Sequence, residues 1–168
     1  MMIFLLIVLT ISVITDLKSR KIYNVVIYPA LLITFAIHFT RGGWEAFSHS
    51  FIGFLTGFGL LLIPYFLGGM GAGDVKLLGL VGAMYGAAFV FQAFLYTAII
   101  GAIIAIIILV ARKGMVKSIL YYIASLRNGI VLKGALNQGA LTATYPYGVA
   151  IAGGSIVSLV MAQGWMPL

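Results

Sequence analysis

The sequence predicts an all-α fold, a polytopic membrane bundle of about six transmembrane helices with a further helix at the cytoplasmic interface. Its 168 residues are 63% hydrophobic and 8% charged, and a water-soluble domain of this size could not cover so much apolar surface. Several apolar runs approach the roughly 20 residues that a helix needs to cross the hydrocarbon layer. Charged residues and glycines separate these runs, so each run is expected to form its own helix.

The expected spans follow the apolar runs in order. The first run is expected to stay in the protein as a membrane span, because it lacks the basic start and small-residue cleavage site of a secretory signal. Residues 75–111 could also form a single helix, but about 37 residues would reach roughly 55 Å, well beyond the bilayer. We therefore expect a hairpin near Gly86 to Gln92 and one integral-membrane domain over residues 1–168. The spans are residues 1–15, 22–40, 51–67, 75–90, 92–111 and 143–163.

The distribution of cations predicts the orientation. With six spans and both termini outside, nine of the ten Lys and Arg residues lie on the cytoplasmic side, and only Arg41 lies outside. Residues 112–133 place apolar residues at helical spacing among five cations. This pattern predicts the interfacial helix, either as an anchor to anionic lipid or as a docking surface for a membrane-bound substrate. We attribute the net charge of +7 to the cations that orient the chain in the membrane, and we expect no nucleic-acid partner.

Some site chemistries are excluded by the residue types present. The chain has no cysteine, which excludes disulfides, thiolate zinc sites and a cysteine nucleophile. His38 and His49 flank the expected outer loop, and we do not expect them to bind a metal. The pairs Gly53/Gly57 and Gly82/Gly86 match the small-xxx-small pattern, which predicts close helix packing.

The acidic residues are the strongest candidates for a functional site. Of the three in the chain, Glu45 falls in the outer loop, whereas Asp16 and Asp74 end the first and third spans at the same rim. Ionisable groups at membrane depth are costly and tend to mark function. Two neighbouring carboxyls cannot both ionise easily, so one would hold a proton while the other takes one from water, as in aspartic proteases. Two structural alternatives remain: Asp74 could cap the next helix, and Asp16 could pair with Arg20.

The stretch GGMGAGDVKLLG, residues 68–79, surrounds Asp74 with glycines. We expect Gly71 and Gly73 to allow positive φ angles and the close approach of an extended substrate backbone.

The segments around Asp16 and Asp74 resemble the signatures of a known family. GGMGAGDVKL is similar to the GxGD signature of the type IV prepilin peptidases, and DLKSRKIYN, Asp16 to Asn24, is similar to their D-x5-I-P-N signature. The resemblance covers nearly the whole chain, including a late Pro-aromatic-Gly element at 146–148, and is closest to the short Tad/Cpa-type members. Tyr23 stands where the family usually has proline.

The resemblance implies that Asp16 and Asp74 are the catalytic pair of a membrane aspartic endopeptidase. It would remove the leader of a pilin-like precursor at the cytoplasmic face of a prokaryotic cell membrane, with the precursor and membrane lipid as its partners. Lys76 fits the family's G-D-x-K pattern and could orient a carboxylate or a substrate carbonyl, or act as a cytoplasmic anchor. Asn24 could hydrogen-bond near Asp16 or cap the second span. The cysteine-rich zinc segment of the larger, methylating members has no counterpart here, so methylation is not expected and no cofactor is expected.

Two other functions compete with this interpretation. A presenilin-like enzyme also uses GxGD but cuts within a helix, and the motif around Asp16 favours the prepilin type. A small proton-coupled transporter would also keep two carboxylates among glycine-broken helices. Transporters usually place such charges near the midplane, whereas Asp16 and Asp74 flank cation clusters.

Overall fold

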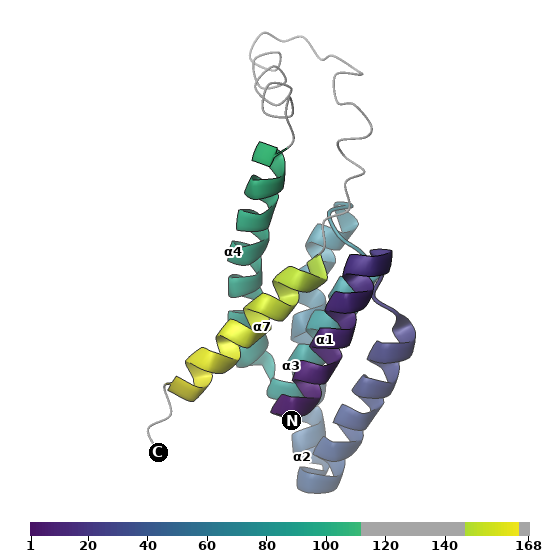
Figure 1. Ribbon diagram of the computed structural model, residues 1–168. Coiled ribbons are helices and arrows are strands. Elements are labelled where there is room, and N and C mark those ends of the chain that lie inside the picture. The colour runs from purple at the N-terminus through teal and green to yellow at the C-terminus, as the bar shows by residue number, and fades with distance from the viewer. Residues whose placement is uncertain (112–146, 165–168) are drawn as a thin grey trace. The chain divides into compact units, whose positions relative to one another are not determined.

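The computed structural model describes residues 1–111 and 147–164. These residues form five helices and no strand, which confirms the all-α class for the described part of the chain (Figure 1). The helices are α1 (Met2–Ser19), α2 (Asn24–Phe66), α3 (Ala72–Tyr85), α4 (Ala87–Ala111) and α7 (Tyr147–Gly164). The expected interfacial helix at 112–133 lies outside the described residues.

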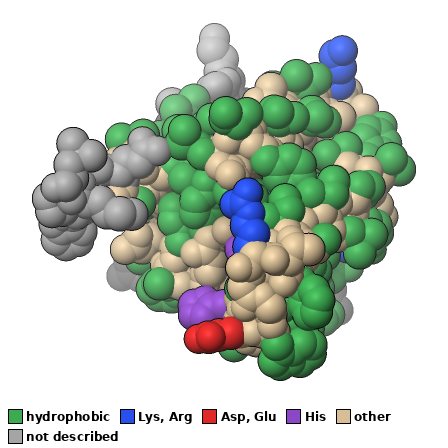
Figure 2. Space-filling view, turned by 90° about the horizontal axis from the view of Figure 1, so that it is seen from below, with side chains coloured by type: hydrophobic (Ala, Val, Ile, Leu, Met, Phe, Trp, Pro, Cys, Tyr) green, Lys and Arg blue, Asp and Glu red, His purple; other side chains and the backbone are tan. Residues whose placement is uncertain are grey.

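Several helices have the character of membrane spans. Among the described residues, three are long and apolar enough to cross a membrane: α1, α2 and Ala87–Ile108 of α4. Tyr147–Ala162 of α7 is a shorter apolar helix. Figure 2 shows that hydrophobic side chains also cover much of the face seen from below. The membrane character is supported, whereas the predicted count of six spans is not confirmed.

Helix α2 contains a sharp break in its middle. Its backbone leaves the helical conformation at Gly42 and at Gly43, which has a φ of 60° that favours glycine. The ring of Phe35 lies 5.4 Å from that of Phe47 and 6.2 Å from that of Phe54, so the two arms lie side by side (Figure 1). The second and third expected spans are therefore the two helical arms of α2, which meet at this break, and only Gly42 and Gly43 of the expected loop are not helical.

Helix α3 forms the centre of the apolar core. Most of its residues are buried, and Leu77, Leu78 and Leu80 are fully enclosed. A Cβ at Gly53 of α2 would meet the carbonyl of Gly82, so the two backbones are in direct contact. This contact confirms the close packing that the glycine pairs predict.

The turn between α3 and α4 consists of Gly86. Its φ of 89° is outside the helical range, and its N–H bonds to the carbonyl of Gly82 at 2.7 Å. Helix α4 begins at the next residue and packs Val90 against Gly57 and Gly82. The expected break is confirmed at this glycine, and the alternative of one continuous helix over 75–111 is wrong.

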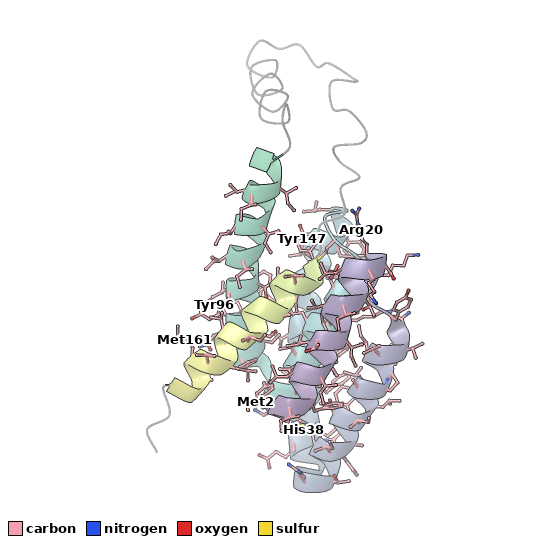
Figure 3. All side chains as sticks on the ribbon, viewed as in Figure 1. Met2, Arg20, His38, Tyr96, Tyr147 and Met161 are labelled. Atoms are coloured by element: carbon pink, nitrogen blue, oxygen red, sulfur yellow. The ribbon has the colours of Figure 1, made fainter. Side chains whose placement is uncertain are left out.

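The chain divides into two compact units, Met1–Gly101 with Pro146–Leu168, and Ala102–Tyr145. Within the first unit α7 packs against α1 and α3. Arg20, just after α1, and Tyr147, which begins α7, lie at the same end of this unit, while Met2 and His38 lie toward the other (Figure 3). The beginning of α7 is thereby brought to the end of α1 that carries Asp16.

Candidate active site

Asp16 lies in the last turn of α1 and is 5% exposed. Its Oδ2 accepts a hydrogen bond from the backbone N–H of Gly148 at 2.9 Å. Gly148 is the second residue of α7, and N–H groups in the first turn of a helix have no acceptor within that helix. The carboxylate therefore provides an acceptor at the positive end of α7.

Arg20 does not hold Asp16 through an ion pair. It is the C-cap of α1 with a φ of 51°, and its backbone N–H bonds to the main-chain carbonyl of Asp16 at 2.8 Å. No ion pair between the two side chains is present in the part of the chain that the structure describes. The carboxylate of Asp16 is therefore held by the N–H of Gly148 and not by the ion pair with Arg20 that the i, i+4 spacing allowed.

Asp74 lies in the first turn of α3 and is 8% exposed. Its Oδ2 accepts a hydrogen bond from the N–H of Gly71, the N-cap residue, at 3.0 Å. Asp74 is the third residue of α3, so it is not the N-cap that the sequence allowed; its carboxylate instead bonds back to the N–H of the N-cap residue, as the N3 residue of a capping box does. It uses only one oxygen, because Oδ1 is buried without a hydrogen-bond partner among residues 1–111 and 147–164. Asp74 thus combines a hydrogen bond at the start of α3 with a second, buried oxygen that has no described hydrogen-bond partner.

The environment changes the acidity of Asp74. Burial raises its pKa from the ordinary 3.8 to about 6, the hydrogen bond from Gly71 opposes this rise, and the negative charge of Asp16 adds to it. The influence of Asp16 requires the two carboxyls to be close enough to interact. The two aspartates, far apart in the sequence, therefore lie within the range over which the charge of Asp16 affects the pKa of Asp74.

The glycines before Asp74 differ from expectation. Gly71 has a φ of −84° and Gly73 is helical, while Gly68 has the positive φ in this stretch, 75°. A Cβ at Gly73 would lie 2.8 Å from Cβ of Ile22, so a residue of this chain makes the close approach. The expectation of positive φ at Gly71 and Gly73 is wrong, because α3 begins at Ala72 and Gly73 lies within it.

Lys76 and Asn24 contact each other beside the start of α2. Nζ of Lys76 donates to Oδ1 of Asn24 at 2.9 Å and to the hydroxyl of Tyr28 at 3.0 Å. The same ammonium lies 5.0 Å from the centre of the Tyr28 ring, a cation–π distance. Sequence reasoning missed Tyr28, although its i, i+4 spacing from Asn24 places both on one helix face.

Tyr23, at the position of the family's proline, is the N-cap of α2. Its φ of −80° and ψ of 132° are extended values that a proline could also adopt. The tyrosine therefore starts the helix with a similar backbone. Asn24 follows the N-cap, so the expectation that Asn24 caps the second span is wrong.

A separate cavity lies near the break in α2. Its volume is about 480 Å³, and its lining includes His38, Glu45 and His49. Figure 2 shows a histidine and an acidic side chain together on the face seen from below. Within the described residues, no three His, Cys, Asp or Glu side chains are grouped so that they could hold a metal ion.

These features define a helical protein with membrane-type helices and two buried, interacting carboxyl groups. Residues 3–106, more than half of the chain, match the type IV leader peptidase family. The chain therefore belongs to the type IV leader peptidase family, a family of peptidases, and this confirms the family predicted from its motifs. No curated protein and no solved structure matches the chain. The matched residues include Asp16 and Asp74 but not Gly148, whose N–H contacts Asp16.

Proposed function

We propose that this peptidase is a membrane aspartic endopeptidase that removes the leader of type IV pilin-like precursors, with Asp16 and Asp74 as its catalytic pair. The observation that carries the proposal is the pair itself. Both carboxyls are buried, and the charge of Asp16 contributes to the raised pKa of Asp74. Such coupling is what allows two carboxyls to share one proton. Membership of the leader peptidase family supplies the substrate class.

The proposed reaction divides the work between the two carboxyls. Asp16 takes a proton from water, whose oxygen bonds to the scissile carbonyl carbon, while protonated Asp74 gives its proton to the carbonyl oxygen. Collapse of the tetrahedral intermediate breaks the C–N bond, and the proton held by Asp16 passes to the leaving nitrogen. One of the two hydroxyl protons of the tetrahedral intermediate returns to Asp74 and the other stays on the new carboxylic acid, so both aspartates regain their starting protonation.

The surroundings of each carboxyl support this division. Asp74 has a pKa of about 6 and a buried Oδ1 without a described partner, so it is suited to hold the shared proton. Oδ2 of Asp16 is occupied by the N–H of Gly148, which leaves Oδ1 to accept a proton from water.

Five further residues are proposed in supporting roles. Gly71 orients Asp74 through its N–H, and Gly73 allows α3 to pack against Ile22. Lys76 is placed by Asn24 and Tyr28, where it can bind a substrate carbonyl or the lipid surface.

The proposed location is the cytoplasmic face of a prokaryotic inner or plasma membrane. The end of α1 that carries Asp16 is followed by Arg20 and Lys21, whereas Arg41 precedes the break in α2. By the positive-inside rule, the end of α1 with Arg20 and Lys21 faces the cytoplasm.

Co-expression with pilin-like precursors tests the proposal. The product's new N-terminus, read by mass spectrometry, is expected at one position at the end of the leader. Cuts within the precursor's apolar helix would instead indicate a presenilin-like activity. Absence of cleavage with every precursor, together with proton-coupled flux in proteoliposomes, would contradict the peptidase and favour a transporter.

A further inference from the structure

Helix α7 lies outside the residues that match the family, yet it contacts one of the two aspartates. We propose that the N-terminus of α7 positions Asp16 for catalysis and that Gly148 is the positioning residue through which it does so. This inference rests on the proposed function, since it assigns a role within the same site.

The contact restricts the carboxylate of Asp16. The N–H of Gly148 reaches Oδ2 at 2.9 Å, and the side chain is enclosed at 5% exposure. An N–H at a helix start is directed along the axis and carries part of the helix dipole's positive charge. One oxygen is thereby fixed, and the orientation of the second follows from the planarity of the carboxylate.

A side chain added at position 148 would press on Asp16. An added Cβ would lie 2.8 Å from Oδ2, 3.1 Å from Cβ and 3.2 Å from Cγ of Asp16. Rotation of the carboxylate could relieve the first contact but not the second, because Cβ of Asp16 is fixed to the backbone of α1. Any other residue must therefore displace Asp16 or move the start of α7.

The packing of α7 opposes the second possibility. A Cβ at Gly154 would lie 2.5 Å from the backbone nitrogen of Thr97 and 2.7 Å from the carbonyl oxygen of Ala93, so α7 rests directly on the backbone of α4. Ile151, between Gly148 and Gly154, is 1% exposed. Because α7 is tightly packed just beyond its first turn, we expect a larger residue at position 148 to displace Asp16.

Gly148→Ala in the purified full-length protein tests the inference, with Gly153→Ala as the matched control. The control adds the same methyl group to the same helix, but the new Cβ would meet the flexible end of Ile100 at 3.0 Å instead of Asp16. With a cleavable precursor, Gly148→Ala is expected to lower kcat by about 10- to 100-fold with KM changed less than about twofold. Gly153→Ala is expected to keep kcat within about twofold of the wild type. A Gly148→Ala protein with normal kcat, or equal losses of kcat in the two variants, would overturn the inference.

Thermal melting in detergent tests the contact without any substrate. Asp16→Ala removes Cγ and both oxygens, so Gly148→Ala should lower the melting temperature less in the Asp16→Ala background than in the wild type. Asp16→Ala keeps Cβ, so the contact of that atom with the added methyl group remains in both backgrounds. Equal shifts would therefore show that the carboxyl group of Asp16 does not meet the added methyl group, and would overturn the positioning role. Failure of the proposed function is a different result, because the wild type would then cut no precursor whatever the melting data show.

Discussion

Replacing Asp74 with asparagine should make the stability of the protein less dependent on pH between about 4 and 6. The wild-type carboxyl has a folded-state pKa of about 6 against an ordinary 3.8. Below pH 3.8 it is protonated in both the folded and unfolded states. As the pH rises toward 6 the unfolded state ionises first, so stability present at low pH is lost. Asparagine does not ionise and can still accept the hydrogen bond from Gly71.

The size of the effect follows from the shift in pKa. A rise from 3.8 to about 6 corresponds to about 3 kcal/mol, at 1.36 kcal/mol for each unit. Asp74 is 8% exposed, so little solvent screening reduces this figure. For a chain of this length, about 3 kcal/mol corresponds to a change in melting temperature of roughly 6–12 °C. The variant should therefore gain that much relative to the wild type between pH 3.5 and pH 7.

The assay is thermal unfolding in detergent across this pH range. Glu45→Gln is the matched control, because it removes an exposed carboxyl outside the proposed site and corrects for the general effect of one lost acid. The reasoning is refuted if the difference between wild type and Asp74→Asn stays constant with pH. It is also refuted if the wild type becomes relatively more stable as the pH rises.

Three further predictions concern the glycines and the topology. Gly57→Val should destabilise the protein by several kcal/mol, because the backbone of α3 occupies the space that the new side chain would need. Gly59→Val, whose side chain would enter open space, should change the melting temperature little. Equal melting temperatures of the two variants would contradict the packing of α2 on α3. Gly71→Val should reduce cleavage at least tenfold with little loss of stability, since its Cβ would lie 3.3 Å from Oδ2 of Asp74; normal activity would remove Gly71 from the site. Cysteines at Ser19 and Ser48 should react with an impermeant reagent from opposite sides, cytoplasmic and external, and labelling from one side would overturn the orientation.

Much of the fold could be predicted because the hydrocarbon layer restricts the possible structures. Apolar runs of sufficient length in lipid must be helical, and the pairs around Gly53 and Gly82 predicted the contact between α2 and α3 that is observed. The continuation of α2 through residues 41 and 44–50 was missed. A charged, glycine-containing segment indicates a loop, yet two non-helical residues, Gly42 and Gly43, suffice to reverse the direction of the chain.

The two acids of the proposed site could be selected from the sequence, but their hydrogen-bond partners could not. Asp16 and Asp74 stand out because acidic residues are rare in this chain, and the structure adds their electrostatic interaction. Their hydrogen bonds come from backbone N–H groups of Gly148 and Gly71. Every residue except proline carries such a group, so residue type alone does not reveal the donor. The close approach of Ile22 to Gly73 likewise depends on tertiary packing.

The most direct test of the central claim is the cleavage rate of purified Asp16→Asn, Asp74→Asn and the double variant on one precursor. If the carboxyls act as one acid–base pair, each single change should lower kcat by about 10²- to 10⁴-fold or more. The double change should lower kcat no further, because residues that act as a unit have non-additive effects. Folding is checked by melting each variant in the same detergent. Substantial cleavage by either single variant, or losses that multiply in the double variant, would contradict a shared catalytic role for Asp16 and Asp74.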